Sequence, residues 1–387
     1  MRFKHESKAA ECNRVSGFPH RLLILAALAG VCPVYPQPSM PPQRRQAPVR
    51  SPEIQAGRIV TFRLQAPDAD SVSVAGQWPN GRTPMVKDTA GVWSATVGPI
   101  DPGVWEYSFR VNGLTMIDHG NEAIKPMHEP RTSILHLPGQ PPLLHDFQDV
   151  PHGSVRRHAY FSKSLGRLRE LEVYTPPGYD RNPKMKYPTL YLQHGRGDNQ
   201  DTWTVHGKAH WILDNLIAQG RAVPMVIVMM DGHAAEWGGG AGGARDNTGL
   251  FERDLLEDVM PFVEAEYRVK NSAADRAICG LSMGGGQSLT VGLNHLDRFA
   301  WVGGFSAGTP PRDAIAAALS DPESTNKRLK LLWIGCGEKD FLIQRNDEFI
   351  ALLKENNIRH EWHLTQGDHS WPVWRIYLGE LAPRLFR

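Results

Sequence analysis

From about residue 150 onward, short apolar segments alternate with segments of helical periodicity, and this pattern limits the fold more than any other feature of the chain. Residues 252–267, for example, carry their apolar side chains on one helical face. Strands that alternate with helices usually pair in parallel and are covered on both faces, so the pattern predicts an α/β fold with a mostly parallel sheet. The predicted strands are residues 189–193, 224–230, 277–281, 301–305, 331–336 and 361–365.

The preceding part of the chain has a different period. Apolar and polar side chains alternate in four short segments separated by Gly and Pro residues, at 59–64, 71–74, 92–97 and 104–111. Such closely spaced strands predict a small all-β, immunoglobulin-like sandwich. We therefore expect a β-sandwich module at residues 53–138, a linker at 139–149 and the α/β domain at 150–387.

The N-terminal part of the chain predicts export. Residues 22–31 are apolar and follow basic residues such as Arg21. Ten residues are too few to cross a bilayer, which takes about 20, but a short apolar segment after a basic flank is typical of a secretory signal. A Pro-rich segment follows. We assign residues 1–36 to a signal peptide region and 37–52 to a linker, and expect a secreted or periplasmic protein without a membrane span.

The composition argues against nucleic acid and metal as partners. The 43 Lys and Arg residues are balanced by 41 Asp and Glu residues, so no basic excess exists to neutralise phosphates. No C-x-x-C or H-E-x-x-H spacing occurs, so no metal site is predicted. We expect Cys279 and Cys336 to stay reduced, because the strand around Phe305 should lie between theirs and separate them by roughly 9–10 Å.

One motif carries a specific chemistry. Residues 280–284 read G-x-S-x-G, after a predicted strand and before a helical segment at 287–296. In that context the motif forms a sharp turn that exposes its serine above the sheet. We therefore expect Ser282 to act as a nucleophile, with the Met283 N–H at the helix N-terminus facing a developing oxyanion.

A serine nucleophile needs a base to take its proton and an acid to orient that base. In α/β folds with this motif the chain order is Ser, then Asp or Glu, then His. His369 follows the last predicted strand and Asp340 follows the one before it, so both should lie at the carboxyl edge of the sheet. Glu338 and Asp368 are alternative acids.

The loop after the strand at 189–193 is a candidate second oxyanion donor. Gly195 lets the backbone turn inward, so we expect the Arg196 N–H to point at the oxyanion. His194 is interpreted as a brace for this loop, without a role in proton transfer. The Gly-rich residues 238–243 lack the G-K-[ST] ending of a phosphate-binding loop and predict only a loop beside the site.

These motifs make the α/β domain similar to a known family. Residues 150–387 resemble the esterase D-like carbohydrate esterases of the α/β-hydrolase fold, a group that includes feruloyl and acetyl-xylan esterases. The matching segments are residues 173–179, 191–195, 280–285 and 369–371. The resemblance implies Ser282 as nucleophile, His369 as base, Asp340 as acid, and the Met283 and Arg196 amides as the oxyanion hole.

The β-module has a resemblance of its own. Residues 53–138 are similar to early-set β-sandwich modules of the glycogen-binding type, on segments 74–78, 91–94 and 103–113. Similar esterases pair such a module with a catalytic domain for xylan, which implies a glycan bound by the module. Asn112 replaces the usual Asp, and Asp231, near the expected cleft, stands where Asn is commoner.

Tryptophan is unusually frequent, with 11 residues against 9 Tyr. Five lie in predicted strands and are expected to pack in the core or on a sheet face: Trp93, Trp105, Trp301, Trp333 and Trp362. Four are candidates for substrate contact, because they lie in predicted loops or turns where rigid aromatic faces bind sugars or aromatic acyl groups. These are Trp203, Trp237 and Trp371 near the predicted site, and Trp78 in the module.

The leading hypothesis is a secreted serine esterase that removes feruloyl or acetyl groups from plant polysaccharide, or cleaves small aryl esters, without metal or organic cofactor. The alternatives are an S-formylglutathione hydrolase, a siderophore esterase or an acyltransferase of the same fold. A non-enzymatic alternative is a carbohydrate-binding protein with an inactive hydrolase domain.

Overall fold

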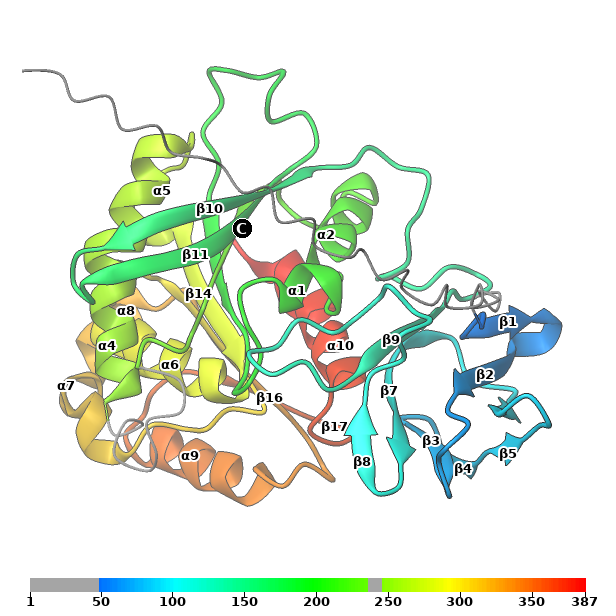
Figure 1. The fold of residues 1–387 in the computed structure, drawn as a ribbon. Coiled ribbons are helices and arrows are strands. Elements are labelled where there is room, and N and C mark those ends of the chain that lie inside the picture. The colour runs from blue at the N-terminus through cyan, green and yellow to red at the C-terminus, as the bar shows by residue number, and fades with distance from the viewer. Residues whose placement is uncertain (1–48, 236–245) are drawn as a thin grey trace, which may run out of the picture. The chain divides into compact units, whose positions relative to one another are not determined.

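The computed structural model describes residues 49–235 and 246–387. The predicted signal region, most of the Pro-rich linker, the Gly-rich residues 238–243 and Trp237 lie outside the described residues. Pro48–Arg387 forms one compact unit, in which the β-module and the α/β domain contact each other (Figure 1).

The β-module consists of two antiparallel sheets. One has the order β1-β2-β6-β5; in the other, β4-β3-β7-β8, strand β9 also pairs with β7. Residues 117–132, between β8 and β9, form a long loop that we call the β8–β9 loop. The strands are β1 (Glu53–Gln55), β2 (Ile59–Gln65), β3 (Val72–Gly76), β4 (Arg82–Pro84), β5 (Val86–Lys87), β6 (Val92–Val97), β7 (Gly103–Val111), β8 (Leu114–Met116) and β9 (Ser133–Leu137).

Trp78 lies in the core between these sheets, and the prediction that it contacts glycan from an exposed turn is wrong. Its side chain is only 4% exposed and stacks on Phe62 with 5.5 Å between ring centroids. Gly76 makes this possible, because a Cβ there would lie 2.1 Å from the indole ring. The chain after β3 thus folds the indole inward onto Phe62 and Tyr107.

The α/β domain is built on an eight-stranded sheet of order β10-β11-β13-β12-β14-β15-β16-β17. Strands from β12 onward are parallel, while β10 and β11 form an antiparallel hairpin at one edge. The predicted α/β class with a mostly parallel sheet is therefore confirmed. The bounds are β10 (Ser154–Ser162), β11 (Arg167–Thr175), β12 (Thr189–Gln193), β13 (Val226–Met230), β14 (Arg276–Leu281), β15 (Trp301–Phe305), β16 (Leu331–Gly337) and β17 (Glu361–Thr365).

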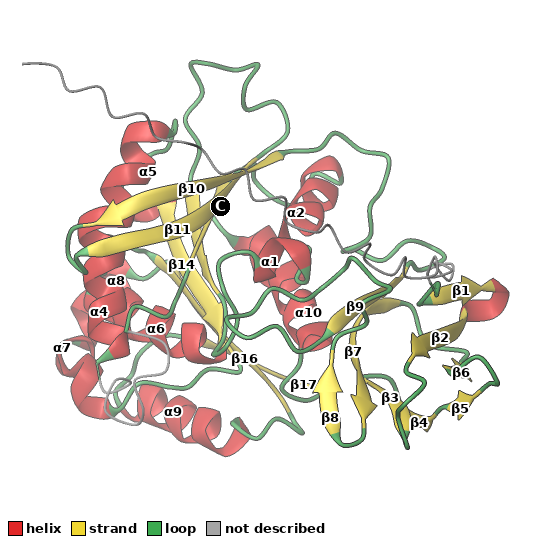
Figure 2. Cartoon of the chain, in the orientation of Figure 1, coloured by secondary structure: helices red, strands yellow, loops and turns green. Residues whose placement is uncertain are grey.

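Helices cover both faces of this sheet, each over its own apolar core (Figure 2). Helices α4, α5, α6 and α9 pack on one face, and α2 and α10 on the other. The helices are α1 (Thr202–Val205), α2 (Ala209–Ala218), α4 (Asn247–Arg253), α5 (Met260–Glu266), α6 (Ser282–Asn294), α7 (Ala316–Ser320), α8 (Pro322–Arg328), α9 (Ile343–Glu355) and α10 (Trp371–Leu381). Short 3₁₀ turns occur at Ala56–Arg58, Ala273–Asp275, Arg312–Ile315 and Ala382–Arg384.

Two predicted helices differ from the structure in their bounds. The helix predicted at 252–267 begins earlier, at Asn247, and contains a π-helical segment at Asp254–Val259 between α4 and α5. The helix predicted at 287–296 begins at Ser282 itself, directly after β14. The glycines at 284–286 let its first turns pack closely against the backbone of His194 and Gly308.

The two cysteines of the α/β domain are free and buried, as predicted. Strand β15 lies between β14, which carries Cys279, and β16, which carries Cys336. The tryptophans of the central strands, Trp301 and Trp333, are buried in the core. In the described part of the chain, no helix has the length and apolarity needed to cross a bilayer.

The burial of Trp78 leads to a stability prediction. Trp78→Ala should lower the free energy of unfolding by about 3–5 kcal/mol, because it opens a cavity beside Phe62. Trp78→Phe keeps an aromatic ring and should cost clearly less. Urea unfolding followed by circular dichroism measures both. A Trp78→Ala variant that unfolds like wild type would contradict the buried position.

Candidate active site

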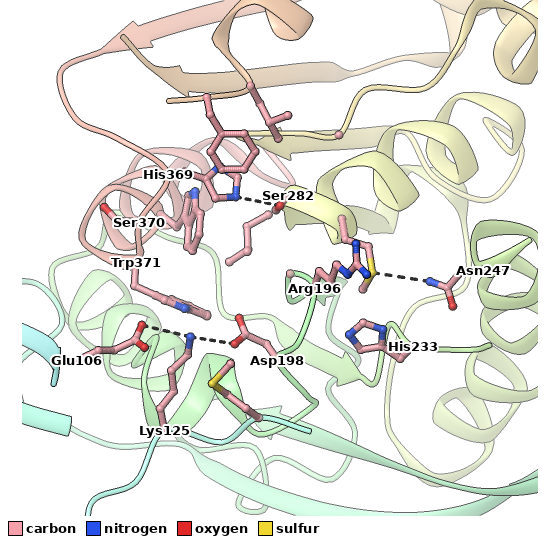
Figure 3. A pocket seen from close by; sticks show the side chains of 18 of the residues that line it. Glu106, Lys125, Arg196, Asp198, His233, Asn247, Ser282, His369, Ser370 and Trp371 are labelled. Carbon is pink, nitrogen blue, oxygen red and sulfur yellow. Dashed lines mark hydrogen bonds and ion pairs between the residues drawn. The ribbon is translucent and has the colours of Figure 1, made fainter. Parts of the chain in front are cut away.

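The loops that follow the parallel strands meet over one cavity of about 1000 Å³ at the carboxyl edge of the sheet. Ser282 follows β14, Asp340 follows β16 and His369 follows β17, while Arg196 lies on the loop after β12. Ser282, His369 and Arg196 line the cavity among the described residues (Figure 3).

Ser282 occupies a strained turn between β14 and α6. Its φ is 71°, in the left-handed region that non-glycine residues rarely adopt. Gly284 permits this turn, because a Cβ at that position would lie 2.3 Å from the carbonyl oxygen of His194. The turn places the Ser282 hydroxyl at the N-terminus of α6, as a nucleophile elbow requires.

Ser282, His369 and Asp340 form a continuous hydrogen-bonded chain. His369 Nε2 lies 3.0 Å from Ser282 Oγ, and His369 Nδ1 lies 2.9 Å and 3.0 Å from the two carboxylate oxygens of Asp340. Of the three acids considered from the sequence, Glu338 and Asp368 are exposed, whereas Asp340 is buried. The carboxylate beside His369 is therefore that of Asp340.

The surroundings keep Asp340 ionised and His369 in place. Burial alone would raise the pKa of Asp340, but hydrogen bonds from His369, Ser306 and the Leu342 amide lower it below its usual value. The His369 ring lies against Phe341 and Trp374, with centroid distances of 4.4 Å and 4.9 Å. An ionised Asp340 can orient His369 and stabilise the imidazolium that forms when it takes a proton.

The loop of residues 194–198, which carries Arg196, is held by two histidines and is called here the oxyanion loop. His194 Nδ1 donates to the Gly195 carbonyl (2.8 Å), and its Nε2 accepts the Gly232 N–H (2.8 Å). His233 Nε2 accepts the Gly197 N–H at 2.9 Å. Burial lowers the pKa of His233 to about 3, so its ring stays neutral and can accept this bond. His194 thus braces the loop, and both of its ring nitrogens are occupied.

The β8–β9 loop of the module also contacts the oxyanion loop. Met127 pairs with Asp198 in an antiparallel bridge, and the His128 N–H donates to the Gly197 carbonyl at 3.0 Å. His128 Nε2 also lies 3.2 Å from a carboxylate oxygen of Asp231. Asp231, the residue that departs from the family pattern, therefore faces the module.

A buried ion bridge joins the module to the same loop. Lys125 Nζ lies 2.9 Å from Asp198 and 3.2 Å from Glu106 of β7 (Figure 3). The side chains of Lys125, Glu106 and Asp198 are almost completely buried. Burial would lower the pKa of Lys125, but the Asp198 and Glu106 charges raise it above its usual value, so the ammonium persists.

The ion bridge extends into the α/β domain through His206 and Arg375. His206 Nε2 lies 3.5 Å from Glu106, and Arg375 of α10 donates to the His206 carbonyl at 3.1 Å and 3.2 Å. Burial raises the pKa of Glu106, but His206 and Lys125 outweigh that effect and hold it well below its usual range. The network thus connects β7, the oxyanion loop and the helix that follows His369.

Two of the tryptophans predicted to contact substrate, Trp371 and Trp203, differ in whether they line the cavity. Trp371 lines the cavity but is only 2% exposed, and its contact with substrate stays a prediction. The prediction for Trp203 is wrong: it lies in α1, is only 1% exposed and donates from Nε1 to the Gln193 carbonyl. Its ring packs edge-on against the Trp371 ring, with 4.9 Å between the ring centroids, and so helps to hold Trp371 in position.

The module residues that line the cavity were not predicted from the sequence. They are Gln77, Glu106, Lys125, Met127 and Glu129. No periodicity or motif in the sequence links them to the α/β domain. Asn247 and Phe341 also line the cavity and were not predicted. Within residues 49–235 and 246–387, no group of three or more His, Cys, Asp or Glu side chains could hold a metal ion.

The β-module and the α/β domain match two different families of known proteins. Residues 162–385 match the family described as "Putative esterase", and residues 49–127 match carbohydrate-binding module 48, the isoamylase N-terminal domain. The endo-1,4-beta-xylanase/feruloyl esterase of Xylanibacter ruminicola is 32% identical over 343 residues. That alignment covers 87% of this chain and 46% of the relative, so the chain spans less than half of its length.

Solved structures show the same fold. A ferulic acid esterase from Anaeromyces mucronatus, in complex with ferulic acid, superposes with a TM-score of 0.54 and 25% identity, over 62% of this chain and 93% of that chain. The enterobactin esterase of Shigella flexneri superposes with a TM-score of 0.58 over 84% of this chain and 92% of that chain, at 18% identity. The predicted resemblance to carbohydrate esterases with an N-terminal β-module is confirmed.

The ion bridge leads to a second stability prediction. Lys125→Met should lower the free energy of unfolding by about 3–5 kcal/mol, because it leaves two buried carboxylates without a cation. Adding Glu106→Gln and Asp198→Asn removes those charges and should recover part of the loss. The exposed Lys163→Met is the matched control and should unfold like wild type in urea. A Lys125→Met variant as stable as that control would contradict the paired burial.

The buried histidine of this network predicts a pH dependence. Burial lowers the folded-state pKa of His206 to about 3, whereas an unfolded histidine has a pKa of about 6.5. Between these values the unfolded chain binds a proton that the folded chain does not, so stability falls as pH falls. His206→Gln should therefore reduce the slope of unfolding free energy against pH by up to about 1.4 kcal/mol per pH unit. Urea titrations between pH 6 and 5 measure the slope, and an unchanged slope would contradict the prediction.

Proposed function

This chain belongs to the esterase family that its residues 162–385 match, and we propose that, as a carboxylic ester hydrolase, it removes feruloyl or acetyl groups from plant cell-wall xylan. The observation that carries the proposal is the hydrogen-bonded chain of Ser282, His369 and Asp340 in a cavity large enough for an ester substrate. We propose a Ser-His-Asp acyl-enzyme mechanism at this site.

In the first half of the reaction, Ser282 Oγ attacks the ester carbonyl carbon while His369 Nε2 takes its proton. The carbonyl oxygen becomes an oxyanion, toward which the amides of Met283 and Arg196 donate. Because Met283 lies in the first turn of α6, its N–H has no acceptor within the helix and is available for this role. His369 then gives its proton to the sugar oxygen, which leaves as the alcohol.

In the second half, water attacks the acyl-enzyme and His369 again acts first as base and then as acid. The attack of the water molecule releases the carboxylic acid, and the proton from His369 returns Ser282 to its hydroxyl form. Asp340 stays ionised throughout and keeps the imidazole in the orientation in which Nε2 faces Ser282. No metal or organic cofactor takes part in the proposed steps.

The substrate class is supported by relatives. A relative 32% identical to this chain is named as an endo-1,4-beta-xylanase/feruloyl esterase, and a structural neighbour is a ferulic acid esterase in complex with ferulic acid. The match of residues 49–127 to a carbohydrate-binding module supports a polysaccharide ester. This combination favours a xylan ester over S-formylglutathione, the small thioester considered from the sequence.

We also propose that the protein is secreted or periplasmic. The apolar residues 22–31, within the proposed signal region 1–36, support this location, and a cell-wall polymer must be met outside the cytoplasm. The proposed module and α/β domain keep their bounds of 53–138 and 150–387, with linkers at 37–52 and 139–149.

The mechanism predicts the effect of removing the nucleophile. Ser282→Ala should lower kcat for ester hydrolysis by about 10⁴–10⁶ and leave the fold intact. Ser320→Ala, at an exposed position at the end of α7, is the matched control and should keep wild-type activity. Initial rates with an aryl acetate and a thermal melt give both readouts. Near-normal turnover by Ser282→Ala would show that the nucleophile lies elsewhere.

The substrate class is tested by rates on methyl ferulate, an aryl acetate, feruloylated xylan and S-formylglutathione, measured side by side. The expected result is a higher kcat/KM on the feruloylated or acetylated polysaccharide than on the thioester. A preference for S-formylglutathione would contradict the proposal.

A further inference from the structure

We propose that Arg169 of β11 is a positioning residue for ester hydrolysis. It holds the loop of residues 231–235, called here the buttress loop, from which His233 reaches the oxyanion loop. The inference rests on the proposed function and adds a group on which the reaction rate depends. Among the described residues, Arg169 is not one of those that line the substrate cavity.

The sheet places Arg169 beside the buttress loop. Strand β11 runs antiparallel to β13, and Leu171 pairs with Met230, the last residue of β13. Arg169 lies two residues before Leu171, so it shares the face of that residue and extends past the end of β13, where the buttress loop begins. Its side chain is buried, at 6% exposure. A buried guanidinium needs acceptors for its N–H groups, and the loop supplies them.

The guanidinium binds two carbonyl groups of the buttress loop. Arg169 Nη1 donates to the His233 carbonyl at 2.9 Å, and Nη2 donates to the Asp231 carbonyl. The fork of the guanidinium thus spans the backbone from Asp231 to His233. Because each carbonyl lies in a rigid peptide plane, the two bonds fix the direction of the backbone at His233.

A buried carboxylate sets the orientation of the guanidinium. Arg169 Nε lies 2.9 Å from Oδ2 of Asp254, and Tyr160 donates its hydroxyl to the same oxygen at 2.8 Å. Asp254 is completely buried and is the first residue of the π-helical segment, and such segments often occur at functional sites. Because a guanidinium is planar, the bond from Nε to Asp254 directs the two Nη groups at the buttress loop.

His233 transmits this position to the oxyanion loop. It lines the substrate cavity, and its Nε2 accepts the Gly197 N–H at 2.9 Å (Figure 3). Gly197 follows Arg196, whose N–H is the proposed oxyanion donor. A shift of the Arg169 guanidinium therefore displaces the backbone that carries this donor.

Such a displacement should affect kcat more than KM. Hydrogen bonds to the oxyanion form in the transition state, so their weakening slows the chemical step while substrate binding is kept. Removing one donor commonly costs about 10²–10³ in rate, and a misplaced donor should cost part of that.

Arg169→Lys tests the fork of the guanidinium. Lysine keeps a positive charge beside Asp254, but its ammonium is a point charge that cannot span both carbonyls. The kcat for an aryl acetate should fall about 10–100-fold, with KM within about twofold of wild type. An aryl boronic acid adds reversibly to a serine oxygen and places a boronate oxygen in the oxyanion position. Its inhibition constant should rise at least tenfold.

The boronic acid separates positioning from folding. A variant that only folds less completely contains less active enzyme, so its kcat falls, but the inhibition constant measured on the remaining activity stays that of wild type. A positioning role raises this constant in the folded enzyme. Asp254→Asn is a second variant, which keeps the size of the side chain and weakens the bond to Arg169 Nε. It should raise the inhibition constant in the same direction.

Arg276→Lys is the matched control. Arg276 is a buried arginine of the same sheet, 3% exposed, and donates to a carboxylate oxygen of Glu264. It is the first residue of β14, whereas Ser282 follows the last, so the two lie at opposite edges of the sheet. The variant should keep the wild-type kcat and inhibition constant.

The outcomes separate this inference from the proposed function. An inhibition constant that is unchanged in Arg169→Lys, or that rises equally in Arg276→Lys, would overturn the positioning role while leaving the esterase intact. If Arg169→Lys does not fold, the constant of Asp254→Asn decides in the same way. If wild type hydrolyses no ester, both proposals fail. Because the assay uses an aryl acetate, its result does not depend on which acyl ester is the natural substrate.

Discussion

The ammonium of Lys125 is the group on which the arrangement of the site depends. It joins Glu106 of the module to Asp198 of the oxyanion loop, and all three side chains are buried. Charges in such surroundings are tolerated only when they are paired and hydrogen-bonded. Lys125 and Glu106 both belong to the module, so separating the module from the oxyanion loop would leave the Asp198 carboxylate without its cation. The module and the loop therefore fix each other's position.

This constraint matters for catalysis because the oxyanion loop has to be in place before the substrate arrives. Electrostatic stabilisation of an oxyanion is effective when its donors are preorganised. Lys125 holds Asp198 at one end of the loop, while His233 and the His128 amide bind Gly197 in its middle. His194 binds Gly195 at the other end. Groups from both the module and the α/β domain thus hold the backbone on which Arg196 lies.

Sequence alone predicted the parts of this protein that depend on local patterns. Apolar runs identified strands β12–β17, and the motif around Ser282, with the order of acid and histidine, identified the residues that the structure joins by hydrogen bonds. The hairpin β10–β11 was missed because it lies at the edge of the sheet and alternates charged with apolar residues instead of forming an apolar run. Trp78 and Trp203 were misjudged because a turn in the sequence does not reveal whether its side chain folds inward. The pairing of Lys125 with Asp198 could not be predicted, since it depends on how two separately patterned segments pack.

The cavity wall supplied by the module contains two kinds of residue, and they differ in how freely they can change. Lys125 and Glu106 are buried in the ion network, so a substitution at either position affects the fold and the oxyanion loop together. Gln77 and Glu129 are exposed, and surface substitutions commonly change stability by no more than about 0.5 kcal/mol. The exposed positions of this wall can therefore vary while the buried bridge keeps the oxyanion loop in place. A module joined to the domain by a free linker would lack this division, because its residues would have no fixed distance from Ser282. The buried bridge thus makes the module part of the cavity, and the exposed residues beside it can change without loss of the fold.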